Sequence, residues 1–282
     1  MTYIRWLIVA GPALLLGVLM VQHLTVHPSK MNRYLLALCT AFFALVVVLA
    51  LGFEGRALLA AIPLALTLFT AGYWGQTRAF LNRDDPRPVP ELTRDEADPG
   101  LGHTAVVYFT HGEPETYDPI GWINQFNEFD EQGISFVPLL ARPLFVNQLR
   151  KKYLEVGRSE HRRMHMRMVK RLQEALCAEG DRSTRFYCSF LDDNPRPDAA
   201  VIQALNDGAS RIVVSEVFLT LSNHTAEGKE LIEALDVEAR FRVPLVFTGP
   251  MYDSETLQSM FVHRAQAHIG DTAKSEVGIL LV

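Results

Sequence analysis

The sequence has few cysteines: three in 282 residues, at Cys39, Cys177 and Cys188. No two of them form a Cys-x-x-Cys pair or stand at a metal-binding spacing from histidines, which argues against a structural zinc site. An odd and sparse set also argues against a disulfide framework and is typical of reduced thiols in a cytoplasmic compartment. We therefore expect the three cysteines to act as small packing residues.

An excess of basic charge is also lacking. The chain has 27 Lys and Arg against 32 Asp and Glu, for a formal net charge of −5. General nucleic-acid binders normally carry a basic domain, so no nucleic-acid partner is expected.

Long apolar runs, in contrast, are present and are confined to the first part of the chain. Residues 4–21, 34–53 and 57–74 each approach the roughly 20 residues that cross a hydrocarbon core as a helix. The first run resembles a signal peptide, but no small-residue cleavage site follows it and two more runs come next. The pattern predicts that residues 1–81 are a transmembrane anchor of about three helices; the alternative is that one run is only interfacial.

Basic residues predict how this anchor is oriented, because loops rich in Lys and Arg stay in the cytoplasm. Those expected on the cytoplasmic side outnumber the others: they are Lys30, Arg33, Arg78 and Arg83, against Arg5 and Arg56. The expectation is a multi-pass protein of the inner (cytoplasmic) membrane whose large C-terminal part faces the cytoplasm. An interfacial run would invert the amino terminus but not this part.

Residues 82–103 are rich in Pro and charge and are expected to be a semi-rigid linker. From residue 104 onward, strand and helix patterns alternate. We expect strands at 105–110, 134–137, 185–190, 211–217 and 243–248 and from Val277, and helices at 119–132, 159–178, 198–207, 226–235 and 254–269. This alternation predicts an α/β lobe, residues 104–282, with a parallel sheet flanked by helices. The apolar end is either a terminal central strand or the first strand of a second lobe starting near 277.

Three predicted strands end in residues of types that bind metals or transfer protons. "THGEPE" contains His111, "SFLDDNPRP" contains Asp192 and Asp193, and "VFLTLSNHTAEG" contains His224. The carboxyl ends of parallel strands share one edge of the sheet, where ligands bind, so these side chains are expected to converge. Two imidazoles and a carboxylate suit an open site for a divalent first-row metal, and neutral imidazole also accepts protons near pH 7.

Each of these residues also has a purely structural interpretation. A His before Gly at a strand end is often a turn residue, and Asp192 to Pro195 is typical of a turn that leads into a helix. His224, followed by Thr225, fits a helix cap. Spacing alone leaves both interpretations open.

The same motifs resemble a known family. "YFTHGEPE", "FYCSFLDDNPRPDAAV" and "VFLTLSNHTAEG" are similar to the signature strand ends of the class II tetrapyrrole chelatases. In the short sirohydrochlorin cobaltochelatases, the first strand ends in His-Gly, a Phe-Leu-Glu precedes Pro midway, and a Phe-Leu run closes on His. Here Asp192 stands where Glu is usual.

The segment between the first two motifs looks more like ferrochelatase. "GEPETYDPIGWINQFNEFD" is similar to its Gly-Pro-Glu-Thr stretch, and "VPLLARPLFVNQLRKKYLEVG" to its apolar lip. The resemblance covers about residues 105–282. It departs from ferrochelatase because the strand of the second lobe, with its catalytic His, would come after Val282, so no residue of that lobe is carried over.

The resemblance implies a membrane-anchored, ferrochelatase-like chelatase that inserts a divalent metal into a porphyrin-type ring. The metal, most of all Fe²⁺ and otherwise Co²⁺ or Ni²⁺, is a substrate, and no cofactor is implied. The implied metal and catalytic residues are His111 and His224, with Asp192 assisting. The implied ring-binding residues are Leu140, Phe145, Tyr153 and Arg142, the last as a partner of ring propionates.

Alternatives to this function remain open at this stage. They are a sirohydrochlorin chelatase, a non-catalytic haem- or metal-binding membrane sensor or delivery protein, and a tethered α/β module that recognises a protein. The expected partners are the tetrapyrrole, membrane lipid and a second copy of the chain that replaces the missing lobe.

Overall fold

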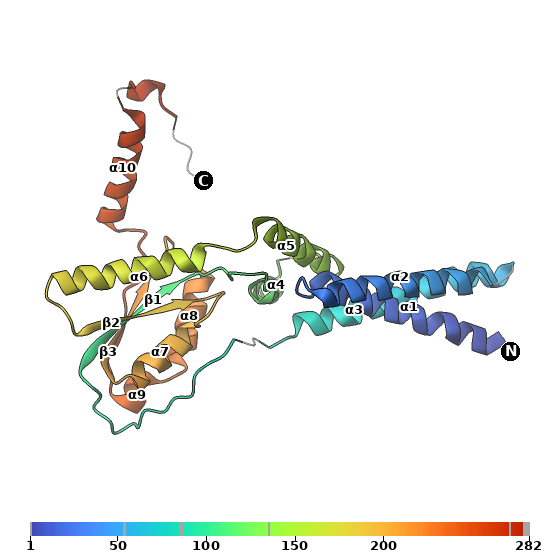
Figure 1. Ribbon diagram of the computed structural model, residues 1–282, viewed down its shortest axis with the longest axis horizontal. Coiled ribbons are helices and arrows are strands. Elements are labelled where there is room, and N and C mark those ends of the chain that lie inside the picture. Colours follow the sequence, from blue (N-terminus) through green and yellow to red (C-terminus); the bar gives the residue numbers. More distant parts are fainter. Residues whose placement is uncertain are drawn as a thin grey trace. The chain divides into compact units, whose positions relative to one another are not determined.

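The computed structural model describes residues 2–52, 55–84, 87–134, 136–220, 222–270 and 272–278 (Figure 1). The chain divides into two compact units. The helical unit contains Met1–Pro86 and Pro114–His161, and the sheet unit contains Arg87–Glu113 and Arg162–Val282. This division differs from the boundaries expected from the sequence, because residues 114–161 pack with the N-terminal helices and much of the expected linker belongs to the sheet unit.

The helical unit begins with three long helices. They are α1 (Thr2–Thr25), α2 (Lys30–Leu51) and α3 (Arg56–Leu81), followed by α4 (Ile120–Glu131), a 3-10 turn η1 (Leu139–Ala141) and α5 (Arg142–Val156). Within the described residues, two stretches are long and apolar enough to cross a membrane, Ile8–Thr25 and Lys30–Leu49. The prediction of three spans is thereby corrected to two. Although α3 is long, its second half is interrupted by polar residues, among them Gln76 and Arg78.

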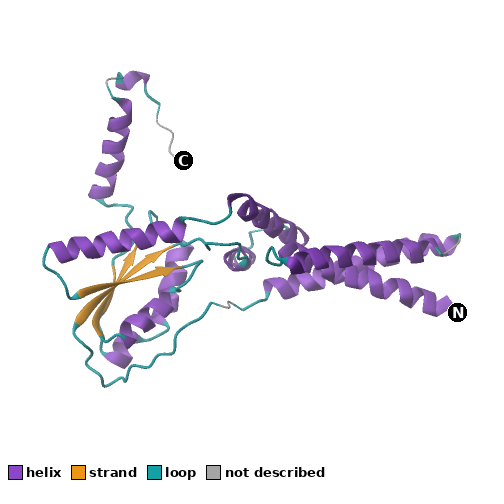
Figure 2. Cartoon of the chain, in the orientation of Figure 1, coloured by secondary structure: helices purple, strands orange, loops and turns teal. Residues whose placement is uncertain are grey.

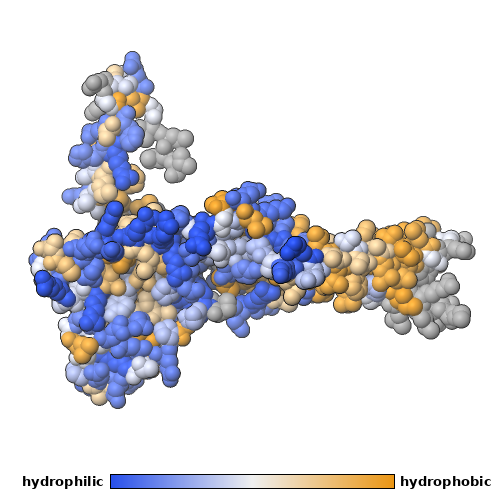
Figure 3. Space-filling model, in the orientation of Figure 1, coloured by the Kyte–Doolittle hydropathy of each residue, from blue (hydrophilic) through white to orange (hydrophobic). Residues whose placement is uncertain are grey.

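Apolar side chains cover much of the surface of α1–α3 (Figure 3). Phe43 of α2 is 61% exposed and Leu59 of α3 is 72% exposed. Apolar exposure over so wide an area marks a membrane or protein contact rather than an ordinary water-facing surface.

Two glycines allow α1 and α3 to touch backbone to backbone. A Cβ atom at Gly17 would lie 2.2 Å from the carbonyl oxygen of Phe69, and one at Gly72 would lie 2.1 Å from that of Leu14. Small residues at helix contacts allow this close approach, as they do in membrane helix pairs.

The other end of the helical unit has a core that joins α1 and α3 to α4 and α5. Its fully buried members include Phe80, Ile123, Phe126 and Val146. Tyr117, also fully buried, donates a hydrogen bond to the carbonyl oxygen of Thr25 at the end of α1 (2.9 Å).

Among the residues that the structure describes, the sheet unit has four strands, all parallel, in the order β2-β1-β3-β4. They are β1 (His103–Thr110), β2 (Thr184–Phe190), β3 (Ala209–Glu216) and β4 (Leu245–Phe247). The helices are α6 (His161–Ala178), α7 (Pro197–Asn206), α8 (Asn223–Glu233), α9 (Val237–Phe241) and α10 (Glu255–Ile269), with a 3-10 turn η2 (Lys274–Glu276). The predicted α/β class, a parallel sheet flanked by helices, is confirmed (Figure 2).

Both faces of the sheet carry apolar residues, as strand alternation requires. Val107 and Phe109 of β1 pack into the larger core with α7 and α8. Tyr108 points to the other face, where its hydroxyl lies 2.9 Å from Nδ1 of His165 in α6. A strand buried on both faces reads as a continuous apolar run, and this explains the "AVVYF" stretch.

Of the remaining predicted strands, one is not found in the described residues and the other lies mostly outside them. The described residues at 134 and 136–137 form a loop, with residue 135 outside the described part, and the helix α5 follows. Residues 277 and 278 are not in a strand, and the rest of the strand predicted from Val277, residues 279–282, lies outside the described residues.

Candidate functional site

Three strand ends meet at one edge of the sheet. His111 directly follows β1, Asp192 lies two residues after β2, and His224 lies in the first turn of α8, after β3. The ring centroids of His111 and His224 are 4.6 Å apart, with the rings nearly perpendicular at 81°. Oδ2 of Asp192 lies 3.3 Å from Nδ1 of His111. Groups far apart in the sequence thus form one cluster, as expected for the carboxyl ends of adjacent parallel strands.

The backbone places Asp192 beside His111. The parallel pairing of β1 and β2 continues past the strand ends, since the amide of Leu191 donates to the carbonyl of Thr110 (3.0 Å) and that of Asp192 to His111 (2.8 Å). The position of the carboxylate therefore follows from strand register.

Gly112 explains why the histidine is followed by glycine. Its φ is +85°, and a Cβ atom there would lie 2.7 Å from Cβ of Phe190 and 3.3 Å from the amide nitrogen of Asp193. Only glycine accepts both this conformation and this contact without strain. The chain can therefore turn sharply after His111 and leave the imidazole at the edge.

A second glycine sets the distance between the two histidines. A Cβ atom at Gly228 would lie 2.1 Å from Cζ of Phe109, so α8 packs on this ring with no side chain between them. Gly228 is one helical turn after His224, and Phe109 is two residues before His111. This contact holds the two imidazoles together.

The start of α8 is capped without the help of His224. Ser222 and Thr225 form a capping box. The Oγ1 of Thr225 donates to the carbonyl of Ser222 (2.6 Å) and accepts from its amide (3.3 Å). The capping role that the sequence allowed for His224 is therefore filled by other residues.

Two hydrogen-bond acceptors beside His111 determine which of its ring nitrogens carries the proton. Nδ1 lies 3.0 Å from the carbonyl oxygen of Gly112 and 3.3 Å from the carboxylate of Asp192. Both groups accept hydrogen bonds, so the neutral ring carries its proton on Nδ1 and leaves the Nε2 lone pair available. The side chain of His111 is 46% exposed and that of Asp192 is 20% exposed, so a ligand can reach the pair.

Two arginines, neither of them predicted from the sequence, secure the loop after β2. Arg87 donates hydrogen bonds to the carbonyl oxygens of Leu191 and, at 3.2 Å, Asp193. Arg162 lies 3.5 Å from the carboxylate of Asp193, whose side chain is only 8% exposed. The adjacent carboxylates thus differ: that of Asp193 faces the guanidinium of Arg162, whereas that of Asp192 faces the imidazole of His111.

Cys188 in β2 is not a metal ligand candidate. Burial raises its pKa to about 12, so the thiol stays protonated near neutral pH. A thiolate is the form that binds metals.

Across the described ranges, no group of three or more His, Cys, Asp or Glu side chains is arranged to hold a metal ion. The cluster consists of two imidazoles in contact and one carboxylate beside Nδ1 of His111. It is therefore not a complete set of protein ligands, since a structural zinc site would present four.

The ring-binding residues expected from the resemblance belong to the helical unit. Arg142 is 4% exposed and its guanidinium binds the carboxylate of Asp130 through two contacts, 2.7 and 2.5 Å long. It also donates to the carbonyl of Val137 (3.2 Å). Arg142 is therefore bonded to protein oxygens, and its predicted role toward a ring propionate stays a prediction.

The other three lie in different surroundings. Phe145 packs edge-on against Trp122, with ring centroids 4.7 Å apart. The hydroxyl of Tyr153 donates to the carbonyl of Pro114 (3.0 Å), and Leu140 is 42% exposed. Within this unit, Leu140 is therefore the most accessible of the four.

Comparison of the chain with protein-family models gives no match, and comparison with curated proteins gives none either. The chemistry of the strand ends is therefore the basis for assigning a function.

Proposed function

We propose that this protein is a membrane-anchored tetrapyrrole metal chelatase that inserts a divalent metal ion, above all Fe²⁺, into a porphyrin-type ring. The observation that carries the proposal is the contact between His111 and His224, with ring centroids 4.6 Å apart at an accessible sheet edge. The similarity of the three strand-end motifs to those of the class II chelatases supports the same function.

Two imidazoles suit a metal that must arrive and then leave. Nitrogen ligands bind Fe²⁺, Co²⁺, Ni²⁺ and Zn²⁺, and the positions that they leave open can be filled by the pyrrole nitrogens of the ring. A closed set of four protein ligands would hold the ion instead of transferring it. In this proposal, His111 and His224 bind the metal first and the ring nitrogens replace them.

Metal insertion releases the pyrrole N–H protons, so the site needs a base. His111 is the better candidate, because its Nδ1–H faces the carboxylate of Asp192 and its Nε2 is left to accept a proton. The carboxylate stabilises the imidazolium that forms and keeps the ring oriented. Nε2 of His111 cannot hold the metal and a proton at once, so in this proposal His111 first releases the metal, which stays on His224 and the ring nitrogens, and then accepts one pyrrole proton. The second pyrrole proton passes to solvent water.

The N-terminal helices fit a substrate that partitions into lipid. The proposal places α1 and α2 across the inner membrane and the sheet unit in the cytoplasm. The flat, apolar faces of a tetrapyrrole favour delivery from the membrane. Within the sheet unit, Arg162 is the proposed partner of a ring carboxylate, because its side chain is 36% exposed.

The test is metal insertion by the full-length protein in detergent or nanodiscs. A dicarboxylate porphyrin is mixed with Zn²⁺, Co²⁺ or, without oxygen, Fe²⁺, and insertion is followed by the change in the visible absorption bands. Loss of a general base costs about 10²- to 10⁴-fold in rate, so His111→Ala and His224→Ala should each lower the rate by at least about 10²-fold. Asp192→Asn should lower it by about tenfold, because second-layer partners contribute less.

The matched control is His263→Ala, which removes an exposed imidazole from α10. It should leave the rate unchanged. Full activity of the His111 variant would remove the mechanism. Tight porphyrin binding without turnover by the unmodified protein would identify a haem- or metal-delivery protein instead.

A further inference from the structure

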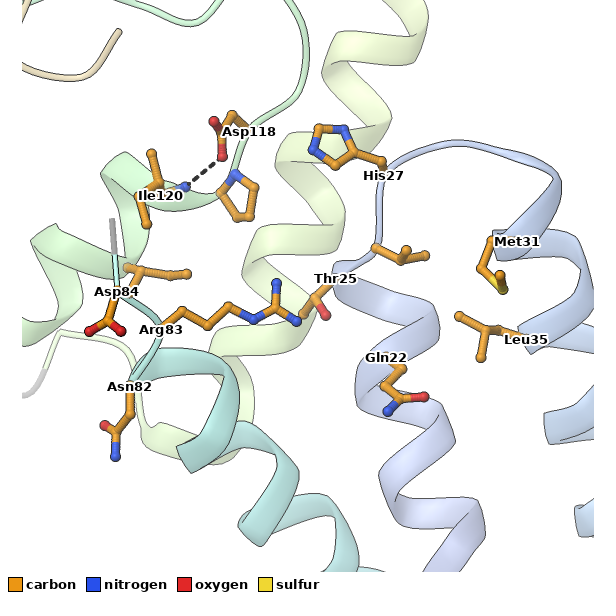
Figure 4. A pocket seen from close by; sticks show the side chains of 13 residues that line it. Gln22, Thr25, His27, Met31, Leu35, Asn82, Arg83, Asp84, Asp118 and Ile120 are labelled. Atoms are coloured by element: carbon orange, nitrogen blue, oxygen red, sulfur yellow. Dashed lines mark hydrogen bonds between the residues drawn. The ribbon is translucent and has the colours of Figure 1, made fainter. Parts of the chain in front are cut away.

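A cavity of about 830 Å³ lies in the helical unit (Figure 4). It opens where α1 ends, α2 begins, α3 ends and α4 begins. The volume falls within the range of sites for small organic ligands. None of its lining belongs to the strand-end cluster.

The cavity has two kinds of wall. Apolar side chains form one, and uncharged polar and charged side chains form the other. The apolar ones include Met31, Leu35, Ile120 and Ile123, and the polar ones include Gln22, Thr25, His27, Asn82, Arg83, Asp84 and Asp118. A ligand that fills it must itself be amphiphilic, because unpaired polar groups and water-exposed apolar groups are both unfavourable.

The charged side chains that line the cavity restrict which polar group a ligand can carry. The guanidinium of Arg83 reaches into the cavity toward Thr25 (Figure 4). Its carbon lies 5.1 Å from the ring centroid of Phe80, and no ion pair joins it to Asp84 or Asp118 among the residues that the structure describes. One cation and two carboxylates therefore line the same space without neutralising each other directly.

Such a lining disfavours a simple ion of either sign. An anion at Arg83 would lie near the carboxylates of Asp84 and Asp118, and a cation would lie near Arg83. A zwitterion satisfies both signs at once. One oxygen of Asp118 already accepts a hydrogen bond from the amide of Ile120 (3.1 Å), which fixes this carboxylate at the start of α4.

The cavity also lies where lipid head groups are expected. The candidate span Ile8–Thr25 ends at the cavity, and the candidate span Lys30–Leu49 begins there. Met31 and Leu35 are one helical turn apart on α2, so the apolar wall continues along this helix toward the hydrocarbon layer.

We propose that this cavity binds one phospholipid whose head group carries both a phosphate and a primary ammonium group. Arg83 binds the phosphate, Asp118 and Asp84 bind the ammonium, and Met31 and Leu35 contact the upper acyl chain. The inference rests on membrane insertion of α1 and α2, as in the proposed function, and is independent of metal insertion.

The test uses the full-length protein in nanodiscs of phosphocholine lipid. Fluorescent lipids with identical acyl chains and phosphoethanolamine, phosphocholine or phosphoglycerol head groups are titrated in. A charged hydrogen bond is worth about tenfold in affinity, so the phosphoethanolamine lipid should bind about tenfold more tightly than either of the others.

Two variants separate the charges. Arg83→Gln should weaken binding of the phosphoethanolamine lipid by about tenfold, with Arg78→Gln as the matched control. Arg78 lies in the last turn of α3, over the ring of Trp74 and outside the cavity, so its loss should have no effect. Asp118→Asn keeps an oxygen for the amide of Ile120 and should weaken only the phosphoethanolamine lipid.

Three results would overturn the proposal. They are equal affinity for all three head groups, an Arg83 variant that behaves like the Arg78 control, and a preference for phosphoglycerol that Asp118→Asn does not reduce. Release of the protein from membranes by alkaline carbonate would refute membrane insertion, and with it this inference, whereas the metal insertion assay tests the strand-end site separately.

Discussion

The two units of this protein hold their polar groups in different ways. In the helical unit, Arg142 and Arg150 are 4% and 6% exposed and turn their nitrogens to protein oxygens. Arg150 donates to the carbonyls of His23 (2.5 Å) and Val26 (3.1 Å), where α1 ends. In the sheet unit, the side chain of His111 is about half exposed; its Nδ1 lies beside the carboxylate of Asp192 and the carbonyl oxygen of Gly112, and its ring packs edge-on against that of His224.

This difference separates structural from chemical roles. A buried guanidinium is costly to desolvate and stabilises the fold only when protein oxygens satisfy it. The half-exposed imidazole of His111, in contrast, is oriented at Nδ1 by the backbone and a carboxylate. Whether the polar atoms of a side chain already have protein partners is therefore more informative here than the residue type.

The largest expected effect comes from separating the two imidazoles. Gly228→Ala would place a methyl group against the ring of Phe109 and push α8 away. Overpacking of this kind typically costs about 1–3 kcal/mol. We expect a loss of that size in the free energy of unfolding and at least about 10²-fold slower metal insertion, since misplacement of reacting groups by about 1 Å costs that much.

Gly75→Ala is the control, because a Cβ atom at this glycine of α3 would meet nothing within 4 Å. This variant should match the parent protein in both stability and rate. A fully active Gly228 variant would show that the distance between the imidazoles does not matter.

A second prediction concerns the buried pair in the helical unit. Arg142→Ala removes the bonds to Asp130 and the contact with the ring of Phe126 (5.0 Å from the guanidinium carbon). Loss of one member of a buried pair costs about 3–5 kcal/mol, and because Asp130 is 51% exposed we expect the lower part of that range. Denaturant unfolding measures this loss, and metal insertion per folded molecule should change less than about twofold if Arg142 is structural.

Arg158→Ala is the surface counterpart. Arg158 is 64% exposed and lies 3.7 Å from Glu115, so its loss should cost less than about 1 kcal/mol. If Arg142→Ala slowed metal insertion strongly at unchanged stability, Arg142 would return to the role of a ring-binding residue.

The smallest expected effect concerns Asp181, a carboxylate that accepts several hydrogen bonds although it is not buried. Asp181 precedes β2 and accepts hydrogen bonds from Thr184 (side chain 2.6 Å, amide 3.1 Å) and Ser183 (amide 2.8 Å, side chain 2.9 Å). These bonds lower the pKa of Asp181 to about 2, and the bond from the Thr184 hydroxyl contributes most. A lowered native pKa means that the carboxylate stabilises the fold above the unfolded pKa of about 3.9, and that this contribution is lost as pH falls toward about 2. Melting temperatures measured over this interval should fall more steeply for the parent than for Asp181→Asn.

The sheet could be predicted because its pattern is local and strong. Each of β1, β2 and β3 begins and ends within two residues of its predicted position. Parallel order then places the residues after these strands on one edge, so the neighbourhood of His111 and His224 followed from topology. Their roles in metal binding and proton transfer stay predictions.

The helical unit was harder to predict because its core includes long polar side chains. The buried positions of α5 are Arg142, Pro143, Val146 and Arg150, so no apolar period marks the helix. The same arginines look like ligand-binding cations in the sequence, since nothing nearby identifies Asp130 or the end of α1 as their partners. Tertiary pairing of this kind has no local signal.

The contact between Gly17 and Gly72 has a consequence for the seam between α1 and α3. With backbone pressed against backbone, nothing fits between the two helices at this level, so together they expose less surface than two separate cylinders would. Any side chain added at either glycine would have to push the two helices apart.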